Sequence, residues 1–277
     1  MKFNRALENT LSALVVPTLC VGQASMFYDT TWAGPVQLAN STLSPNASSP
    51  SGFNLAEATL IIPPLSLPSN PHEQVDLYTA SFWVGLDGFL LSDSLAGVRG
   101  LWQAGLFASL SVNGTATYTG FYEWVPEDPV SIPASQLALA AGDHLYVRVN
   151  TSNGGLQGSV ALTNLNTSQT FTITRDAPVS WRGPTWPAPG SSAEWIVEAG
   201  TYLNTTRYVW PDWGNATFVD ARACWNTTGE CVVPGQPGGE ERITAVWWND
   251  TGILYSQSGA GDGDVWLAYV EEEFNGP

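Results

Sequence analysis

Basic side chains are scarce in this chain of 277 residues. Nine lysines and arginines stand against 25 aspartates and glutamates, giving a formal net charge of −16 at pH 7, and Lys2 is the only lysine. A surface of this charge repels nucleic acids and anionic membranes, so we predict neither as a partner. Carboxylates take up protons near pH ~4. Self-repulsion then fades without being replaced by positive charge, so we expect a protein that works in acid.

Histidine and cysteine are also scarce, which narrows the possible chemistry. The chain has two histidines, His72 and His144, and three cysteines. Neither histidine has a spacing to the cysteines that suits a zinc site. No Gly-x-Ser-x-Gly motif is present, and two histidines give no convincing nucleophile triad. The residues therefore predict neither a metal centre nor a serine hydrolase.

Long apolar runs are absent, and the apolar stretch at the amino terminus is too short to span a membrane. Lys2 and Arg5 form a basic start before the apolar run from Leu11 to Val21, and small residues follow it. This order is typical of a secretory signal peptide. We therefore predict a signal peptide at residues 1–24 and a secreted, extracellular mature chain at residues 25–277.

The cysteines and the asparagines agree with export. Cys20 would leave with the signal peptide, so Cys224 and Cys231 remain as a pair around a short loop. A disulfide is the favoured interpretation, ahead of a free thiol or a metal pair. The sequence also holds nine Asn-x-Ser/Thr sequons, which predict a glycoprotein if the host glycosylates them. They are Asn40, Asn46, Asn113, Asn150, Asn166, Asn204, Asn215, Asn226 and Asn249.

Helical periodicity is absent over any long window, whereas short alternating apolar runs between Gly, Pro, Asn and Ser recur throughout. This pattern predicts an all-β protein with two packed antiparallel sheets, a β-sandwich, in one domain that we expect to be monomeric. A Pro- and Trp-rich loop at 176–192 leads into a strand around Glu194 as a candidate cleft wall. The other predicted strands are 31–36, 57–62, 77–86, 101–112, 115–125, 145–150, 158–163, 169–174, 216–220, 243–248 and 264–270.

Asn113-Gly114, between two of these strands, is the strongest hairpin signal in the chain. A regular two-residue turn at this point pairs Gln103 with Trp124 and puts Tyr122 on the same side as Gln103. Glu123 is then expected on the opposite face, and a bulge would reverse that assignment.

Two polar side chains stand in apolar, tryptophan-flanked segments about ninety residues apart. Gln103 lies in Gly100-Leu101-Trp102-Gln103-Ala104-Gly105, and Glu194 lies in Ala193-Glu194-Trp195-Ile196-Val197-Glu198. Burying either side chain without a partner costs several kcal/mol, so two such settings suggest a shared site. A carboxylate that takes a proton from water, beside an amide that donates to an oxyanion, suffices for amide hydrolysis. The plainer interpretations are a satisfied core amide and a structural carboxylate at the rim.

Six segments together resemble one protein family, the eqolisins or glutamic peptidases. They occur in the family's order and cover most of the chain from about Trp32 onward. Any one of them alone is a weak signal, but the ordered set is specific. The segments are Trp32-Ala33-Gly34, Phe82-Trp83-Val84-Gly85-Leu86-Asp87-Gly88, Trp102-Gln103-Ala104-Gly105, Phe121-Tyr122-Glu123-Trp124, Ala193-Glu194-Trp195-Ile196-Val197-Glu198 and Gly214-Asn215-Ala216-Thr217-Phe218.

The resemblance implies a concanavalin A-like sandwich and an acid endopeptidase that cleaves proteins or peptides without metal or cofactor. It implies that Glu194 acts as general base on water and then returns the proton to the leaving amine. Gln103 would orient that water and stabilise the oxyanion through its amide N–H. The residues that we predict to bind substrate or support the cleft are Trp32, Trp83, Asp87, Tyr122 and Trp124.

The chain departs from the family pattern in three respects, and two other functions stay open. Fungal members carry a basic propeptide, but only a few residues separate Ala24 from Trp32, so we expect no inhibition at neutral pH by such a segment. Phe107 stands where the family often has an acidic residue, four positions after the glutamine, and the cysteine loop lies downstream of the family's usual disulfide. One alternative is a lectin-like carbohydrate-binding sandwich without catalysis. The other is a glycosidase with Glu123 and Glu194 as paired carboxylates on one face, which the expected hairpin register disfavours.

Overall fold

The computed structural model describes residues 25–29, 31–39, 52–71, 75–89, 100–179, 185–199, 210–226, 228–236, 240–248 and 252–274. The predicted signal peptide at 1–24, with Cys20, lies outside the described residues, as do His72 and the sequons at Asn40, Asn46, Asn204 and Asn249. Within the described ranges, no helix is long and apolar enough to cross a membrane. The helical element there is a single 3₁₀ turn, Asn153–Gly155.

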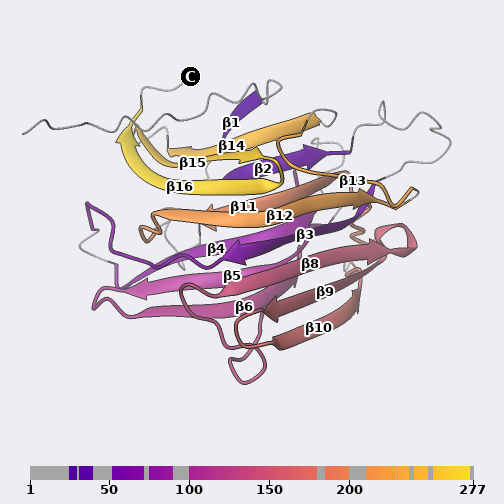
Figure 1. Cartoon of the computed structure of the whole chain (residues 1–277), viewed down its shortest axis with the longest axis horizontal. Coiled ribbons are helices and arrows are strands. Elements are labelled where there is room, and N and C mark those ends of the chain that lie inside the picture. Colours follow the sequence, from indigo (N-terminus) through magenta and orange to yellow (C-terminus); the bar gives the residue numbers. More distant parts are fainter. Residues whose placement is uncertain are drawn as a thin grey trace, which may run out of the picture.

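Strands build almost all of the described chain and form two sheets, so the predicted all-β sandwich is confirmed (Figure 1). The neighbouring strands are antiparallel except for β1, which lies parallel to β14. Sheet A has the order β1 (Ser25–Asp29), β14 (Glu240–Trp248), β2 (Trp32–Leu38), β11 (Ser192–Ala199), β4 (Leu77–Leu86), β5 (Trp102–Ser111), β6 (Ala116–Trp124) and β7 (Val130–Ser131). Sheet B has the order β15 (Ile253–Gly261), β16 (Asp264–Glu273), β12 (Asn215–Trp225), β3 (Phe53–Ile61), β8 (His144–Ser152), β9 (Gln157–Asn164) and β10 (Gln169–Asp176), with β13 (Cys231–Val232) beside β12.

Strand β14 joins the two sheets. Its first residues, Glu240 to Thr244, pair with β2 in sheet A, whereas Trp247 and Trp248 pair with β15 in sheet B. In Figure 1, β1, β14, β15 and β16 lie together at the top of the molecule, and β9 and β10 lie at the opposite end. The chain therefore passes from one layer to the other without breaking the hydrogen-bonded order of strands.

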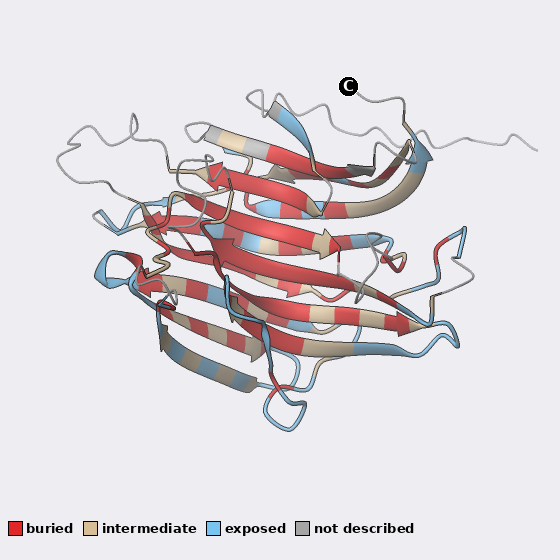
Figure 2. Cartoon of the chain, turned by 180° about the vertical axis from the view of Figure 1, so that it is seen from behind, coloured by how far each residue is buried: buried red, intermediate tan, exposed pale blue. Residues whose placement is uncertain are grey.

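The core lies between the sheets and is formed by alternate residues of each strand. Phe82, Trp102 and Trp195 of sheet A pack there with Leu60 and Phe218 of sheet B. The strands β4, β5 and β11 are buried at almost every position and not only at alternate ones. Figure 2 shows this as nearly unbroken red along the middle strands, beside the tan and blue alternation of β10 at the bottom. The outer face of sheet A is therefore also covered.

A second apolar cluster covers that outer face. It consists of Val36, Trp83, Leu101, Phe121 and Ile196, with Trp32 and Phe107 packed against it. These residues alternate along their strands with the inter-sheet core residues. Both faces of the central strands thus exclude water, which is the condition under which a polar group acts most strongly.

The hairpin between β5 and β6 exists, but its predicted register is wrong by one residue. Its loop has three residues, because Ser111 and Thr115 close it and Gly114 takes a φ of +84°. Gln103 therefore pairs with Glu123, and Trp124 pairs with Trp102. A glycine in the left-handed region after Asn113 is the usual way to build such a three-residue loop.

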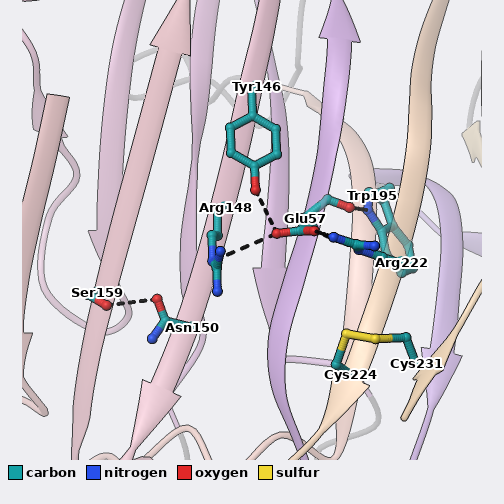
Figure 3. A network of polar contacts seen from close by, with 9 residues as sticks. All are labelled: Glu57, Tyr146, Arg148, Asn150, Ser159, Trp195, Arg222, Cys224 and Cys231. Atoms are coloured by element: carbon teal, nitrogen blue, oxygen red, sulfur yellow. Dashed lines mark hydrogen bonds and ion pairs between the residues drawn. A yellow bond between two sulfur atoms is a disulfide. The ribbon is translucent and has the colours of Figure 1, made fainter. Parts of the chain in front are cut away.

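The predicted disulfide is confirmed. Cys224 of β12 and Cys231 of β13 pair directly and are joined through their sulfurs (Figure 3). The same view shows the indole of Trp195 directed at Glu57 of β3, where its Nε1–H donates to the Glu57 backbone carbonyl at 3.1 Å. Since Trp195 follows Glu194 in β11, this bond ties the strand of the predicted catalytic glutamate to sheet B.

Candidate active site

Sheet A brings the two predicted catalytic residues to one face. Glu194 of β11 pairs with Gly85 of β4, and Gly85 pairs with Gln103 of β5. Directly paired residues point to the same face of a sheet, so Glu194 and Gln103 share a face and a row. Two strand spacings, roughly 9.6 Å, separate their Cα atoms. Because residue 85 is a glycine, it places no side chain between them. We call Val36, Glu194, Gly85, Gln103 and Glu123 the central row.

Gln103 is fixed by Glu123, the last member of the central row. The Gln103 Nε2 donates to Glu123 Oε2 at 2.6 Å, and only 3% of Gln103 is exposed. Burial raises the pKa of Glu123, the bond from Gln103 lowers it, and the charge of Asp128 raises it. The other end of the amide, Oε1, has no hydrogen-bond partner in the described part of the chain. The amide therefore keeps an acceptor oxygen and one N–H for a ligand.

Glu194 is fully buried, and the described residues give its carboxyl no hydrogen-bond partner. Burial raises the pKa of Glu194 well above its ordinary value, the nearby Ser192 hydroxyl lowers it, and the charge of Asp87 raises it. Ser192 Oγ likewise has no hydrogen-bond partner among the described residues. Within the described chain, no hydrogen bond to the Glu194 carboxyl offsets its desolvation.

Asp87 is buried and supports the site through hydrogen bonds to the backbone. It follows β4 with a φ of +66° and is completely buried. Its carboxylate accepts hydrogen bonds from the backbone N–H groups of Gly190 and Ser191 and from the Ser191 hydroxyl. These residues immediately precede β11, so Asp87 fixes the start of the strand that carries Glu194.

A second carboxyl, Glu198, lies on the same face of β11 as Glu194. Its Oε2 accepts the indole N–H of Trp83 at 2.9 Å. The pKa of Glu198 is raised to about 7. Burial of the carboxyl is the largest cause, the hydrogen bonds from Trp32 and Trp83 lower the pKa, and the charges of Glu123 and Asp29 raise it. The rings of Trp32 and Trp83 pack edge to face with centroids 4.9 Å apart. The two predicted cleft tryptophans thus belong to the site face.

The structure does not bring Tyr122 and Trp124 to this face. Because of the corrected register, both side chains alternate with Glu123 and lie on the side of the inter-sheet core. Trp124 donates its indole N–H to the backbone carbonyl of Trp186 at 2.9 Å, which ties β6 to the residues before β11. The described residues also contain no group of three or more His, Cys, Asp or Glu side chains arranged to hold a metal ion.

Sequence reasoning missed Glu198 and Ser192. Both follow the period of two that marks one face of a strand: Ser192, Glu194, Ile196 and Glu198 alternate with the core residues of β11. Once Glu194 is chosen, this alternation alone identifies Glu198 as a second carboxyl on its side.

Comparison with known proteins shows the family of the chain. A family model described as the peptidase A4 family matches residues 30–269. The chain belongs to this family, the eqolisins. It is a glutamic endopeptidase by that membership, which favours peptide hydrolysis over the lectin-like and glycosidase alternatives. None of the curated proteins matches the sequence.

Two solved structures share the fold of this eqolisin. One is scytalido-glutamic peptidase with a transition-state analogue inhibitor, with a TM-score of 0.64 and 20% identity over 88% of this chain and 100% of that one. The other is SCP-B, an eqolisin in complex with the tripeptide Ala-Ile-His, with a TM-score of 0.61, 20% identity and the same coverage. At this identity the likeness concerns the fold alone.

Proposed function

We propose that this eqolisin is a secreted, acid-acting endopeptidase in which Glu194 and Gln103 act on one water molecule. The observation that carries the proposal is the central row, with Glu194 and Gln103 on either side of a glycine. Both side chains are buried, and both have polar atoms without a partner in the described chain. Buried polar atoms left unpaired by the protein are expected where a ligand supplies the partner.

The chemistry follows from the groups that are present. The Glu194 carboxylate takes a proton from the water as its oxygen attacks the carbonyl carbon of the scissile peptide bond. The negative charge that develops on the carbonyl oxygen is stabilised by the Gln103 N–H that Glu123 leaves free. Glu194 then gives the proton to the leaving nitrogen as the C–N bond breaks. Glutamate is thus a base in the first step and an acid in the second.

The raised pKa of Glu194 determines whether its carboxyl is protonated in the resting enzyme in acid. Because burial raises its pKa, this carboxyl stays protonated up to a pH well above the ordinary pKa of a glutamate. A water molecule that donates hydrogen bonds to the carboxyl oxygens favours the ionised form and lowers the pKa. Substrate and water binding therefore prepare the base, and the profile of kcat/KM with pH should have its acid limb above the ordinary pKa of a glutamate.

Secretion is supported by the predicted signal peptide and by the surplus of acidic residues. Expression of the full chain in a secreting host, followed by amino-terminal sequencing of the protein in the medium, tests this part. A mature amino terminus near residue 25 is the expected result. Retention of the intact chain in the cell would contradict it.

The dyad is tested by hydrolysis of casein at about pH 5 to 6, on the active side of the expected acid limb. Glu194→Gln is expected to lower kcat by roughly 10²- to 10⁴-fold, and Gln103→Leu by roughly 10²- to 10³-fold. Glu241→Gln is the matched control, because Glu241 is another partly buried carboxyl with a raised pKa, held by the Gly235 backbone N–H. Undiminished hydrolysis by Glu194→Gln would reject the assigned base.

A further inference from the structure

The indole of Trp83 lies across the central row. Its N–H is held by Glu198, and the opposite edge of its ring lies over Gly85. A Cβ atom added at Gly85 would be 2.8 Å from a ring carbon of Trp83 and 3.1 Å from a methyl carbon of Leu101. The ring therefore occupies the space in the row between Glu194 and Gln103 that the glycine leaves open.

The dyad is closed to solvent in this structure. Trp83 and Glu194 have no exposed surface, and Gln103 has 3%. A peptide bond has to reach both Glu194 and Gln103 to be hydrolysed, and the ring edge of Trp83 stands between them. The ring must therefore move when substrate binds, and the Glu198 hydrogen bond opposes that movement.

We propose that Glu198 is a positioning residue that closes the dyad through Trp83 when it is ionised and releases the ring when it is protonated. The inference rests on the proposed role of Glu194 and Gln103. A hydrogen bond to a charged acceptor is roughly twice as strong as one between neutral groups, so protonation of Glu198 weakens the hold on the indole. The eqolisin is then closed at neutral pH and opens in acid.

The surroundings of Glu198 favour this switch. Among the described residues, the charged groups that face it are the carboxylates of Glu123 from β6 and Asp29 from β1, and Glu194 lies four residues earlier on its own strand. On its row, Ser81 of β4 and Phe107 of β5 are uncharged. With burial as the main cause, the pKa of Glu198 is raised to about 7. Glu198 is ionised above that pH and neutral below it, so the closed form is lost as the pH falls.

Phe107, which stands where the family often has an acidic residue, lies in the same row as Glu198. Position 107 pairs with Ser81, which in turn pairs with Glu198. Phe107 stacks on Phe121 with ring centroids 4.2 Å apart, and it offers no acceptor to the Trp83 indole. The acceptor for this indole is on β11, on the same strand as the base Glu194.

The first test is the profile of kcat/KM from about pH 4 to about pH 9 for the wild type, Glu198→Gln and Trp83→Phe. The glutamine keeps the size and an acceptor oxygen but never ionises, and the phenylalanine keeps a ring without the N–H. In the wild type, kcat/KM should fall about tenfold per pH unit above pH 7, as one ionisation dictates. In both variants this fall, the neutral limb of the profile, should flatten, so that kcat/KM changes by no more than about threefold from pH 6 to pH 8. Glu241→Gln should keep the wild-type limb.

The second test does not depend on catalysis and uses the inactive Glu194→Gln background. The indole N–H signal of Trp83 is assigned in the ¹⁵N-tryptophan NMR spectrum by its absence in Trp83→Phe. It should titrate with a midpoint near pH 7 and become independent of pH when Glu198→Gln is added. A neutral limb and an indole titration that both survive Glu198→Gln would overturn the inference. Full activity of Glu194→Gln would instead defeat the proposed dyad, so the two failures are distinguishable.

Discussion

The side-chain amide of Gln103 donates through Nε2 to Glu123 Oε2 at 2.6 Å. This bond decides which end of the amide is fixed and which end is free, because the carboxylate accepts only from the nitrogen. One N–H and the carbonyl oxygen of Gln103 remain for the reaction. The neighbouring glutamate thus gives the proposed oxyanion donor a defined direction before substrate arrives.

The first prediction concerns that orientation. Glu123→Leu removes the acceptor, so the amide loses its fixed direction and kcat should fall by roughly 10- to 100-fold with little change in KM. Glu123→Gln keeps an acceptor oxygen and should remain within about threefold of the wild type. Steady-state kinetics on one fluorogenic peptide measures both. Equal activity of the leucine variant would show that Glu123 does not orient Gln103.

The second prediction concerns the open position at Gly85. Gly85→Ala introduces a methyl group 2.8 Å from the Trp83 ring and 3.1 Å from Leu101, in the row between the two proposed catalytic residues. We expect a loss of at least about tenfold in kcat/KM and a destabilisation of about 1 to 3 kcal/mol. Gly120→Ala is the control, because its Cβ would meet side-chain carbons of Leu137 and Ile132 at 3.0 and 3.3 Å, in the inter-sheet core. Loss of activity in both variants alike would point to general overpacking.

The third prediction concerns stability and pH. The folded state raises the pKa of Glu194, so it holds a proton that the unfolded chain releases above its ordinary pKa. The stabilising effect is complete below the unfolded pKa and is lost as the pH rises towards the folded pKa. The melting temperature should therefore fall between about pH 4.5 and pH 7, and less so in Glu194→Gln. Calorimetry at both pH values measures this, and an unchanged slope in the variant would contradict the assigned burial.

The fourth prediction concerns the bond between the sheets. Trp195→Phe removes the N–H that binds the Glu57 carbonyl at 3.1 Å and should destabilise the fold by about 1 to 3 kcal/mol. Trp102→Phe removes an equally buried indole whose bond to the Ser159 carbonyl is longer, at 3.4 Å. Urea unfolding should show the larger loss for Trp195. The opposite order would mean that packing, and not the hydrogen bond, dominates at these positions.

The fifth prediction concerns the disulfide. The double substitution Cys224→Ser/Cys231→Ser opens a short loop, and loop entropy gives a loss of about 2.5 kcal/mol. For a chain of this size, that corresponds to a melting temperature lower by roughly 5 °C. The pH profile of activity should not change, because the pair lies at the β12–β13 end of sheet B and not in the central row. A shifted profile would connect this loop with the site.

Local patterns in the sequence were enough to predict many of the strands and the fold class. The strand at 77–86 was predicted with the bounds that the structure has, because its alternation is regular and Asp87-Gly88 ends it. Strand β15 was missed, since Ile253–Gly261 is rich in glycine and serine and is held by its pairing with β16. The hairpin shows the limit of turn signals: Asn113-Gly114 located the turn, but one additional loop residue inverted the faces.

The sequence was enough to select the residues of the site but not to predict which strands lie next to one another. Gln103 and Glu194 stood out because polar side chains are unusual in such apolar strands. That β11 lies beside β4, more than a hundred residues earlier, is a property of the whole sheet and of no local segment. Tyr122 and Trp124 were expected at the cleft but lie on the core side, because the additional loop residue shifts the register of β5 and β6. Glu198 was available from the alternation of β11.

The ends of the strand order matter for a protein that sheds its surface charge in acid, because colloidal repulsion then no longer keeps molecules apart. In the described chain the continuous order of strands ends at β7 and β10, each with one partner strand, while β1 and β13 lie off this order beside β14 and β12. β7 has two residues, too few to template another chain, and β10 carries threonines and Arg175, which pairs with Glu127. Arginine stays cationic at every pH of interest. These two ends of the strand order are thus guarded against intermolecular β-sheet growth under the conditions in which solubility is weakest.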